Sequence, residues 1–87
     1  MEIEWDQEKD TQNRAKHGLA LADAAQLNWA VGRDIQDGRA DYGEIRFVRY
    51  AMLDLRLHVC VYTLRGDSRR IISLRKANNR EILNYGI

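Results

Sequence analysis

The sequence predicts an α+β fold with the element order β-α-α-β-β-β-β-α, in which helices cover one side of a mostly antiparallel sheet. The main observation is the stretch of residues 57–77, where two runs rich in β-branched and aromatic residues flank Gly66-Asp67. That dipeptide suits a tight hairpin turn. Residues 1–5 alternate between polar and apolar side chains, as a short strand does, and residues 78–85 begin with helix-capping signals.

A polar helix is expected after the first strand. Asp6 can act as its N-cap, and Gly18 follows its last turn as a C-terminal stop. His17 lies in that last turn, where a cationic ring interacts favourably with the helix dipole, so we interpret it as structural rather than catalytic. Residues 21–29 predict a second helix. Residues 31–41 form a weaker pattern, which predicts a short strand followed by a mobile acidic loop.

Two hairpins are expected to follow. Residues 44–53 predict a strand that turns at Asp54-Leu55. With this loop, the neighbours on the two strands are Val48 with Val61, Arg49 with Cys60, and Phe47 with Tyr62. Val48 and Val61 would then share an apolar face, and the other two pairs would share a polar one.

A two-residue loop at Gly66-Asp67 sets the register of the last hairpin, because side chains alternate between the faces of a sheet. One face is predicted to belong to the hydrophobic core, and its middle consists of Val59, Val61, Ile72 and Leu74. The other face is predicted to pair His58 with Arg75, Cys60 with Ser73, Tyr62 with Ile71, and Leu64 with Arg69. Because this second face holds His, Tyr, Ser and Arg side chains, we expect the chemistry of the protein to lie there.

A short helix is predicted for residues 78–85. Asn78 is a good N-cap, and Glu81 falls three residues later, as in a capping box. Ile82 and Tyr85 are expected to pack inward from this helix.

The composition indicates one domain, residues 1–87, of an ordinary globular protein with 45% hydrophobic and 31% charged residues. Its net charge of +1 hides an asymmetry, because residues 1–44 carry a net charge of −5 and residues 45–87 a net charge of +6. The basic half is also the β-rich half. A basic sheet face that binds phosphates is one interpretation, and solvated surface arginines are the other.

The chain has no apolar run long enough to cross a bilayer and no signal peptide at its N-terminus. We therefore expect a cytoplasmic protein without a membrane partner. Cys60 is the single cysteine, and no group of His and Cys residues has metal-binding spacing. These counts predict no internal disulfide, no metal site and no cofactor.

Short motifs are distributed along nearly the whole chain. They are Ile3-Glu4-Trp5-Asp6, Lys9 with Asn13 and Lys16-His17-Gly18, Gly43-Glu44-Ile45-Arg46, Val61-Tyr62-Thr63-Leu64-Arg65-Gly66, Arg70-Ile71-Ile72-Ser73-Leu74-Arg75-Lys76-Ala77, and Arg80-Glu81 with Tyr85. In this order and spacing the chain resembles the BrnT toxins of bacterial type II toxin–antitoxin systems. The resemblance implies a RelE-like ribonuclease fold, growth arrest through RNA cleavage, and a BrnA-type antitoxin with a ribbon-helix-helix DNA-binding portion. Operator DNA is then expected to be bound only through the toxin–antitoxin complex.

RNA supplies its own nucleophile, the 2′-hydroxyl, so its cleavage needs cations for the phosphate and a positioned acid or base, but no metal. Arg75 is the first choice for the phosphate, because a guanidinium binds it bidentately and keeps its charge. Arg65 or Arg49 is expected as a second cation. Histidine is the side chain type best suited to acid–base chemistry near neutral pH, so His58 is a candidate acid or base, and Glu44 is a candidate base.

Tyr62 is expected to stack on a nucleotide base or donate a proton, and Lys76 and Arg46 complete the expected RNA-binding set with Arg49. Three candidates also have a structural interpretation: His58 as a mere cross-strand neighbour, Tyr62 as packing, and Glu44 as the partner of an arginine. The alternative function is a non-catalytic module whose basic sheet face binds RNA or an acidic antitoxin segment.

Overall fold

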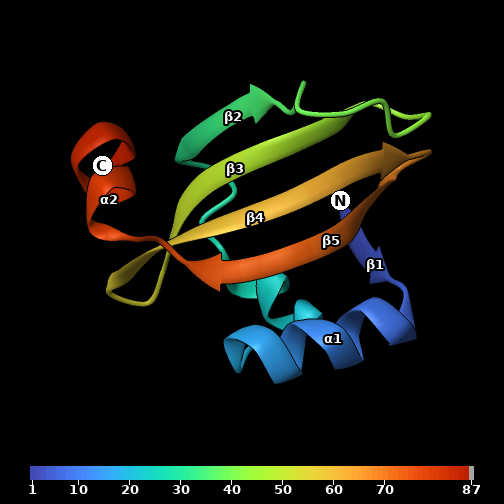
Figure 1. Cartoon of the computed structure of the whole chain (residues 1–87), viewed down its shortest axis with the longest axis horizontal. Coiled ribbons are helices and arrows are strands. Elements are labelled where there is room, and N and C mark those ends of the chain that lie inside the picture. The colour runs from blue at the N-terminus through green and yellow to red at the C-terminus, as the bar shows by residue number, and fades with distance from the viewer. Residues whose placement is uncertain (87) are drawn as a thin grey trace.

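The computed structural model describes residues 1–86 and contains a five-stranded sheet with the strand order β1-β5-β4-β3-β2 (Figure 1). In chain order the elements are β1 (Glu2–Trp5), α1 (Gln7–His17), the 3₁₀ helix η1 (Leu21–Gln26), β2 (Gly32–Gln36), β3 (Arg46–Leu53), β4 (Arg56–Arg65), β5 (Ser68–Lys76) and α2 (Asn79–Tyr85). β1 runs parallel to β5, and the other neighbouring strands are antiparallel. The predicted α+β class and element order are confirmed. None of the helices in the described part of the chain is long and apolar enough to span a membrane.

The helix α1 docks on the sheet through polar side chains. Its buried residues are Asp10 and Asn13. The Asn13 amide donates to the backbone oxygen of Leu74 at 2.9 Å and accepts from the Leu74 N–H at 3.0 Å. Asp10 accepts from the Leu21 N–H at 2.8 Å, and this hydrogen bond lowers the pKa of its carboxyl. Gly18, with a φ of 71°, ends the helix as predicted.

The second predicted helix is the 3₁₀ helix η1, which ends at Gln26 instead of continuing to Trp29. After Gln26 the chain bonds to the sheet and to the preceding turn. The Asn28 N–H donates to the backbone oxygen of Met52 at 2.9 Å, and the Trp29 indole N–H donates to the backbone oxygen of Ala24 at 2.8 Å. These contacts replace the helical hydrogen bonds that the prediction assumed, and they hold η1 against the sheet.

The β3–β4 hairpin turns at Asp54-Leu55 and has the predicted register. The confirmed pairs are Val48 with Val61, Arg49 with Cys60, and Phe47 with Tyr62. The strand begins at Arg46 rather than at residue 44. The short strand predicted within residues 31–41 is β2, which forms an exposed edge beside β3.

The β4–β5 hairpin has the predicted register only near its turn, up to the pair of Tyr62 with Ile71. A bulge then leaves Ile72 without a partner on β4 and shifts the remaining pairs by one residue. The pairs beyond the bulge are Val61 with Ser73, Cys60 with Leu74, Val59 with Arg75, and His58 with Lys76. The predicted pairing of His58 with Arg75 is therefore wrong, and these two side chains point to opposite faces of the sheet.

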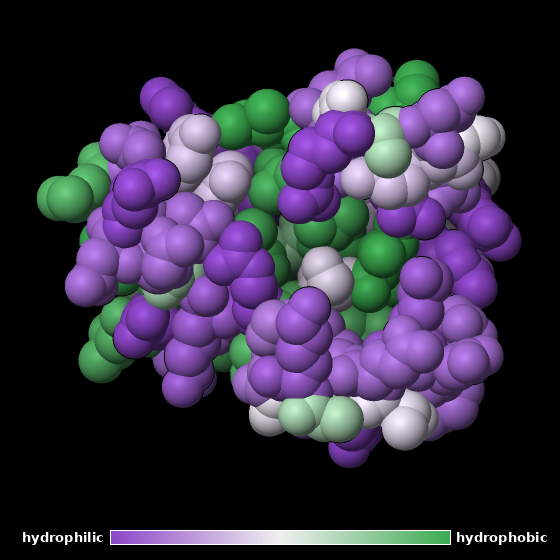
Figure 2. All heavy atoms as spheres, viewed as in Figure 1, coloured by the Kyte–Doolittle hydropathy of each residue, from purple (hydrophilic) through white to green (hydrophobic). Residues whose placement is uncertain are grey.

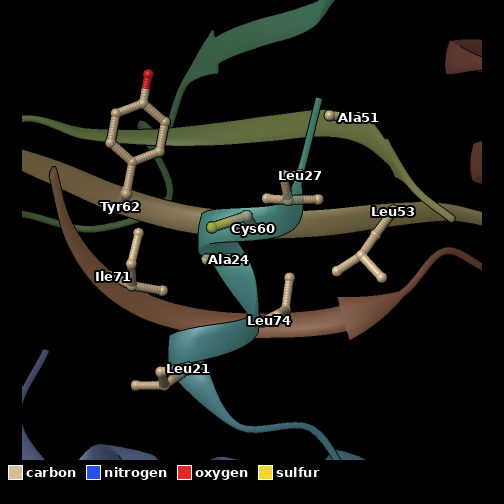
Figure 3. Close-up of a cluster of buried hydrophobic side chains, with 9 residues drawn as sticks. All are labelled: Leu21, Ala24, Leu27, Ala51, Leu53, Cys60, Tyr62, Ile71 and Leu74. Carbon is tan, nitrogen blue, oxygen red and sulfur yellow. The ribbon is translucent and has the colours of Figure 1, made fainter. Parts of the chain in front are cut away.

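The main hydrophobic core lies between the sheet and η1, beside α1 (Figure 3). Its buried members are Leu21, Ala24, Leu27, Ala51, Leu53, Cys60, Tyr62, Ile71 and Leu74. The predicted core face of β4 was therefore the wrong one, since Cys60 and Tyr62 face the helices. The bulge also brings Leu74 to that side. Val59 packs on the other side of the sheet, in a smaller cluster that contains Tyr50, Leu57 and Ala77.

We call the side of the sheet away from η1 the open face. It carries Val48, Tyr50, Val59, Val61, Ser73 and Arg75, and α2 covers one end of it (Figure 1). The predicted capping box is confirmed, because Asn78 and Glu81 each accept from the other's backbone N–H, at 2.8 and 3.0 Å. Tyr85 stacks on Tyr50 with ring centroids 4.0 Å apart. Ile82 stays 37% exposed, so the expectation that it packs inward is wrong.

Candidate functional site

The open face has an apolar middle between two rows that contain arginines. Residues that face one another across neighbouring strands form three rows: Arg33, Tyr50, Val59 and Arg75; Ile35, Val48, Val61 and Ser73; and Arg46, Thr63 and Arg70. A hollow of about 460 Å³ lies over most of the first two rows. Figure 2 shows apolar atoms at its floor, ringed by hydrophilic side chains. Its rim includes His17 at the end of α1 and Asp37 and Arg39 after β2.

Arg75 is the cation at the floor of the hollow, and it is paired with a carboxylate of α2. Its Nη1 and Nη2 atoms donate to the two carboxylate oxygens of Glu81, at 2.8 Å each, and Nη1 also lies 3.3 Å from the backbone oxygen of Lys76. A guanidinium has five N–H donors, so two remain for a ligand. The hydrogen bonds with Arg75 lower the pKa of Glu81 and raise that of Arg75.

The ion pair predicts a pH-dependent stability. Because the pKa of Glu81 is depressed in the folded protein, its ionised form stabilises the fold above the ordinary value of 4.5, and this contribution is lost as the pH falls through the lowered pKa. Glu81→Gln keeps a residue suited to the capping box but removes the charge. We expect it to lower the melting temperature near neutral pH and to have little effect in strong acid. Thermal melting across this range checks the result against Glu2→Gln, an exposed control; an equal shift at all pH values would contradict it.

Arg39 forms a similar pair on the rim. Its Nε and Nη2 atoms donate to the two carboxylate oxygens of Asp37, at 2.8 and 2.7 Å, and the Tyr42 hydroxyl donates to the same carboxylate at 3.2 Å. The hydrogen bonds from Arg39 hold the pKa of Asp37 well below its usual range. The hollow therefore holds two guanidinium groups, each with a carboxylate partner of its own.

His17 reaches the same hollow from the C-terminal end of α1. Burial, together with the nearby positive charges of Lys16 and Arg75, lowers the pKa of His17 below its ordinary value of 6.5. Its imidazole is therefore mostly neutral at neutral pH, the state in which it can accept a proton.

Of the residues expected to act on RNA, Arg75 alone lines the hollow. His58 is 3% exposed and lies on the helix-covered face, where its Nδ1 atom is 2.8 Å from the backbone oxygen of Arg56. Lys76, its partner on β5, is exposed. The structure therefore separates His58 and Lys76 from the hollow by the thickness of the sheet.

Tyr62 and Arg49 belong to a buried network on the helix-covered face. The Tyr62 hydroxyl donates to Asp34 at 3.1 Å, and its ring packs against Trp29 and Phe47 with centroids 5.3 and 5.5 Å away. Arg49 is 5% exposed; it donates to Asp34 and to the backbone oxygen of Trp29, at 2.8 Å each. Burial raises the pKa of Tyr62 to about 12. The structural interpretation of Tyr62 as packing is confirmed.

Glu44, Arg46 and Arg65 lie near one another at the far end of the open face. The Glu44 carboxylate is 3.1 Å from Arg46 Nε and 3.9 Å from Arg65 Nη2. The structural interpretation of Glu44 as the partner of an arginine is confirmed. The apolar middle row of the sheet separates this group from Arg75.

The sequence interpretation missed several residues of the hollow. They are Arg39, Tyr50 and Tyr85, while Ser73 was placed on the polar face without a role and His17 was seen only as a helix-terminal residue. The bulge at Ile72 decides which residues of β5 face the hollow, and the alternation of Ile71 and Ile72 with their neighbours did not predict it.

Residues 1–86 contain no group of three or more His, Cys, Asp or Glu side chains arranged to hold a metal ion. The thiol of Cys60 is fully buried in the core, and burial raises its pKa to about 12. Cys60 is therefore protonated and unreactive at neutral pH.

The fold and the hollow define a small α+β protein whose open sheet face carries two arginines and a histidine around one recess. The family described as "Ribonuclease toxin, BrnT, of type II toxin-antitoxin system" matches residues 5–81, and the chain belongs to this family. Membership confirms the resemblance in the sequence and indicates a ribonuclease toxin that has an antitoxin as its partner. A search of curated proteins finds no match to the chain.

Proposed function

We propose that the chain is an endoribonuclease that cleaves RNA without a metal ion, through attack of the substrate's 2′-hydroxyl, in the hollow on the open face. The observation that carries this proposal is the juxtaposition of Arg75 and a neutral His17 around one recess. The first supplies a fixed positive charge for a phosphate, and the second supplies a proton acceptor. The family description, a ribonuclease toxin, agrees with this chemistry in general terms.

The reaction would begin with a phosphodiester bound to the two free N–H donors of Arg75. His17 takes the proton of the 2′-hydroxyl, whose oxygen attacks phosphorus. The bond from phosphorus to the 5′-oxygen breaks, and that oxygen takes a proton from solvent water and leaves as a hydroxyl. Arg75 stabilises the negative charge that builds up on the non-bridging oxygens, the kind of effect that contributes most in such reactions. The products are a 2′,3′-cyclic phosphate and a 5′-hydroxyl.

Other expected residues take secondary roles in this proposal. Arg46, Arg65 and Arg70 lie on the open face beyond the apolar row, where they would bind the RNA backbone away from the cleaved bond. His58 and Glu44, expected as acid and base, lie outside the hollow, so we assign removal of the 2′-hydroxyl proton to His17 instead.

The antitoxin partner is proposed to be of the BrnA type, with a ribbon-helix-helix portion that binds operator DNA on behalf of the complex. Its acidic or amphipathic segment would cover the open face and so exclude RNA from the hollow. The arginines on that face and the exposed apolar side chain of Ile35 on its rim support such contact.

Cleavage of RNA in EDTA tests the function directly. We expect the purified protein to cut a labelled single-stranded RNA in the chelator, leaving 2′,3′-cyclic phosphate or 3′-phosphate ends. Mass spectrometry of the products identifies the ends. A strict need for added Mg²⁺ with 3′-hydroxyl products would refute the mechanism. Tight RNA binding without any cleavage would favour the alternative, a non-catalytic binding module, for which the arginines on the open face are the supporting observation.

A further inference from the structure

A second recess, a groove of about 150 Å³, lies between α1 and β5. Lys9, Gln12 and Lys16 line it from the helix, and Ile72 and Ser73 line it from the strand. The groove shares Lys16, His17 and Ser73 with the hollow, so the two recesses meet.

The groove follows from the way β5 is paired. β1 pairs with β5 only as far as Ile71, so the edge of β5 is free of a strand beyond the bulge. Asn13 closes this edge at Leu74 with its two hydrogen bonds and holds α1 alongside. Lys9, Gln12 and Lys16 recur at helical spacing on the same side of α1 as Asn13, which points their polar ends along the groove.

The groove is lined by two lysines that have no carboxylate partner within the described residues, Lys9 and Lys16, and Lys16 also borders the hollow. Arg39 and Arg75 in the hollow are both held by carboxylates. Within residues 1–86, by contrast, neither Lys9 nor Lys16 forms a salt bridge. A lysine ammonium is a mobile point charge that suits a phosphate oxygen, and the Gln12 amide adds hydrogen-bond donors.

We propose that this groove binds the RNA phosphate next to the one that is cleaved. The assignment rests on the proposed function, because the neighbouring phosphate is defined by the bond broken in the hollow. The groove has room for a phosphate group beside its lysines, and the larger hollow has room for the nucleotide itself. A single RNA strand would thus run from the hollow, past Ser73, onto α1.

The test uses a non-cleavable 2′-O-methyl RNA of about eight nucleotides, a length within the usual range of single-strand binding sites. Its affinity for the full-length protein is measured by fluorescence anisotropy at several salt concentrations. The slope of the logarithm of the binding constant against the logarithm of the salt concentration counts the phosphates that the protein neutralises. We expect the Lys9→Gln, Lys16→Gln double variant to make this slope shallower by about 0.7 for each phosphate that it no longer neutralises. Arg14→Gln removes one positive charge from the same helix at a residue that pairs with Asp10 away from the groove, and it should leave the slope nearly unchanged.

A neutral methylphosphonate placed at each linkage in turn locates the phosphate that the groove binds. At one linkage, adjacent to the cleaved one, the methylphosphonate should weaken RNA binding by the wild type but not by the double variant. Unchanged binding and slope in the double variant, or an equal loss at every linkage, would overturn the proposal. Failure of the proposed function is separately visible, because the wild type would then not cut the all-ribose form of the same RNA. Thermal melting of each variant confirms that it is folded.

Discussion

Replacing Arg75 with alanine is expected to lower the rate of RNA cleavage by about 10²-fold or more, the scale of losing one strong oriented donor to the transition state. Arg75→Lys should recover only part of the rate, because an ammonium keeps the charge but loses the planar pair of donors. The measurement is the cleavage rate of a labelled RNA under single-turnover conditions. Folded Arg75→Ala protein that cleaves at the wild-type rate would remove Arg75 from the mechanism.

Two controls separate this effect from loss of stability and from loss of charge. Glu81→Gln breaks the same ion pair but keeps the cation. The drop in its melting temperature therefore shows how much stability Arg75→Ala should lose through the broken ion pair alone. Arg69→Ala removes a guanidinium that lies over the Trp29 ring at 3.9 Å, on the helix-covered face. We expect Arg69→Ala to cleave RNA at close to the wild-type rate.

Asn13→Asp should have the largest effect on stability, a loss of roughly 3 kcal/mol in the free energy of unfolding. The Asn13 amide nitrogen donates to the backbone oxygens of Leu19 and Leu74, at 2.9 Å each, and its side chain is buried. An aspartate would turn a carboxylate oxygen toward both carbonyls, so two donors disappear and a charge is buried. Urea denaturation measures the change.

Gln12→Glu is the matched control, because it adds the same charge at the neighbouring, exposed position of α1. A similar shift of the unfolding midpoint in both variants would mean that charge on the helix, rather than the missing donors of Asn13, causes the destabilisation.

Local signals in the sequence were sufficient to predict the order of the elements. The turns at Asp54-Leu55 and Gly66-Asp67, the stop at Gly18 and the cap at Asn78 are each specified by residues next to them in the chain. Such features depend little on the rest of the fold, and all of them were predicted at their observed positions.

The orientation of the sheet could not be predicted, because β4 is apolar on both sides. Cys60 and Tyr62 on one face, and Val59 and Val61 on the other, are all buried. The alternation therefore gave no preference for the face that the helices cover. The bulge at Ile72 then placed each residue of β5 from Ser73 to Lys76 on the face opposite to the predicted one.

The position of His17 in the hollow depends on contacts between distant parts of the chain. The helix that carries His17 lies beside β5, where Asn13 binds the backbone of Leu74, 61 residues further along the chain. The sequence around a helix-terminal histidine does not show whether such a distant contact exists. The interaction with the helix dipole was therefore the interpretation that the local sequence supported.

The bulge in β5 also decides how many arginines one side of the molecule can present. Arg70 and Arg75 are separated by an odd number of positions, and in an unbroken strand an odd separation sends two side chains in opposite directions. The unpaired Ile72 changes the parity, so that Arg70 beside Thr63 and Arg75 beside Val59 point the same way. The one extra residue in β5 therefore places a positive charge near each end of the open face. In a regular strand, one of these two arginines would face the helices instead.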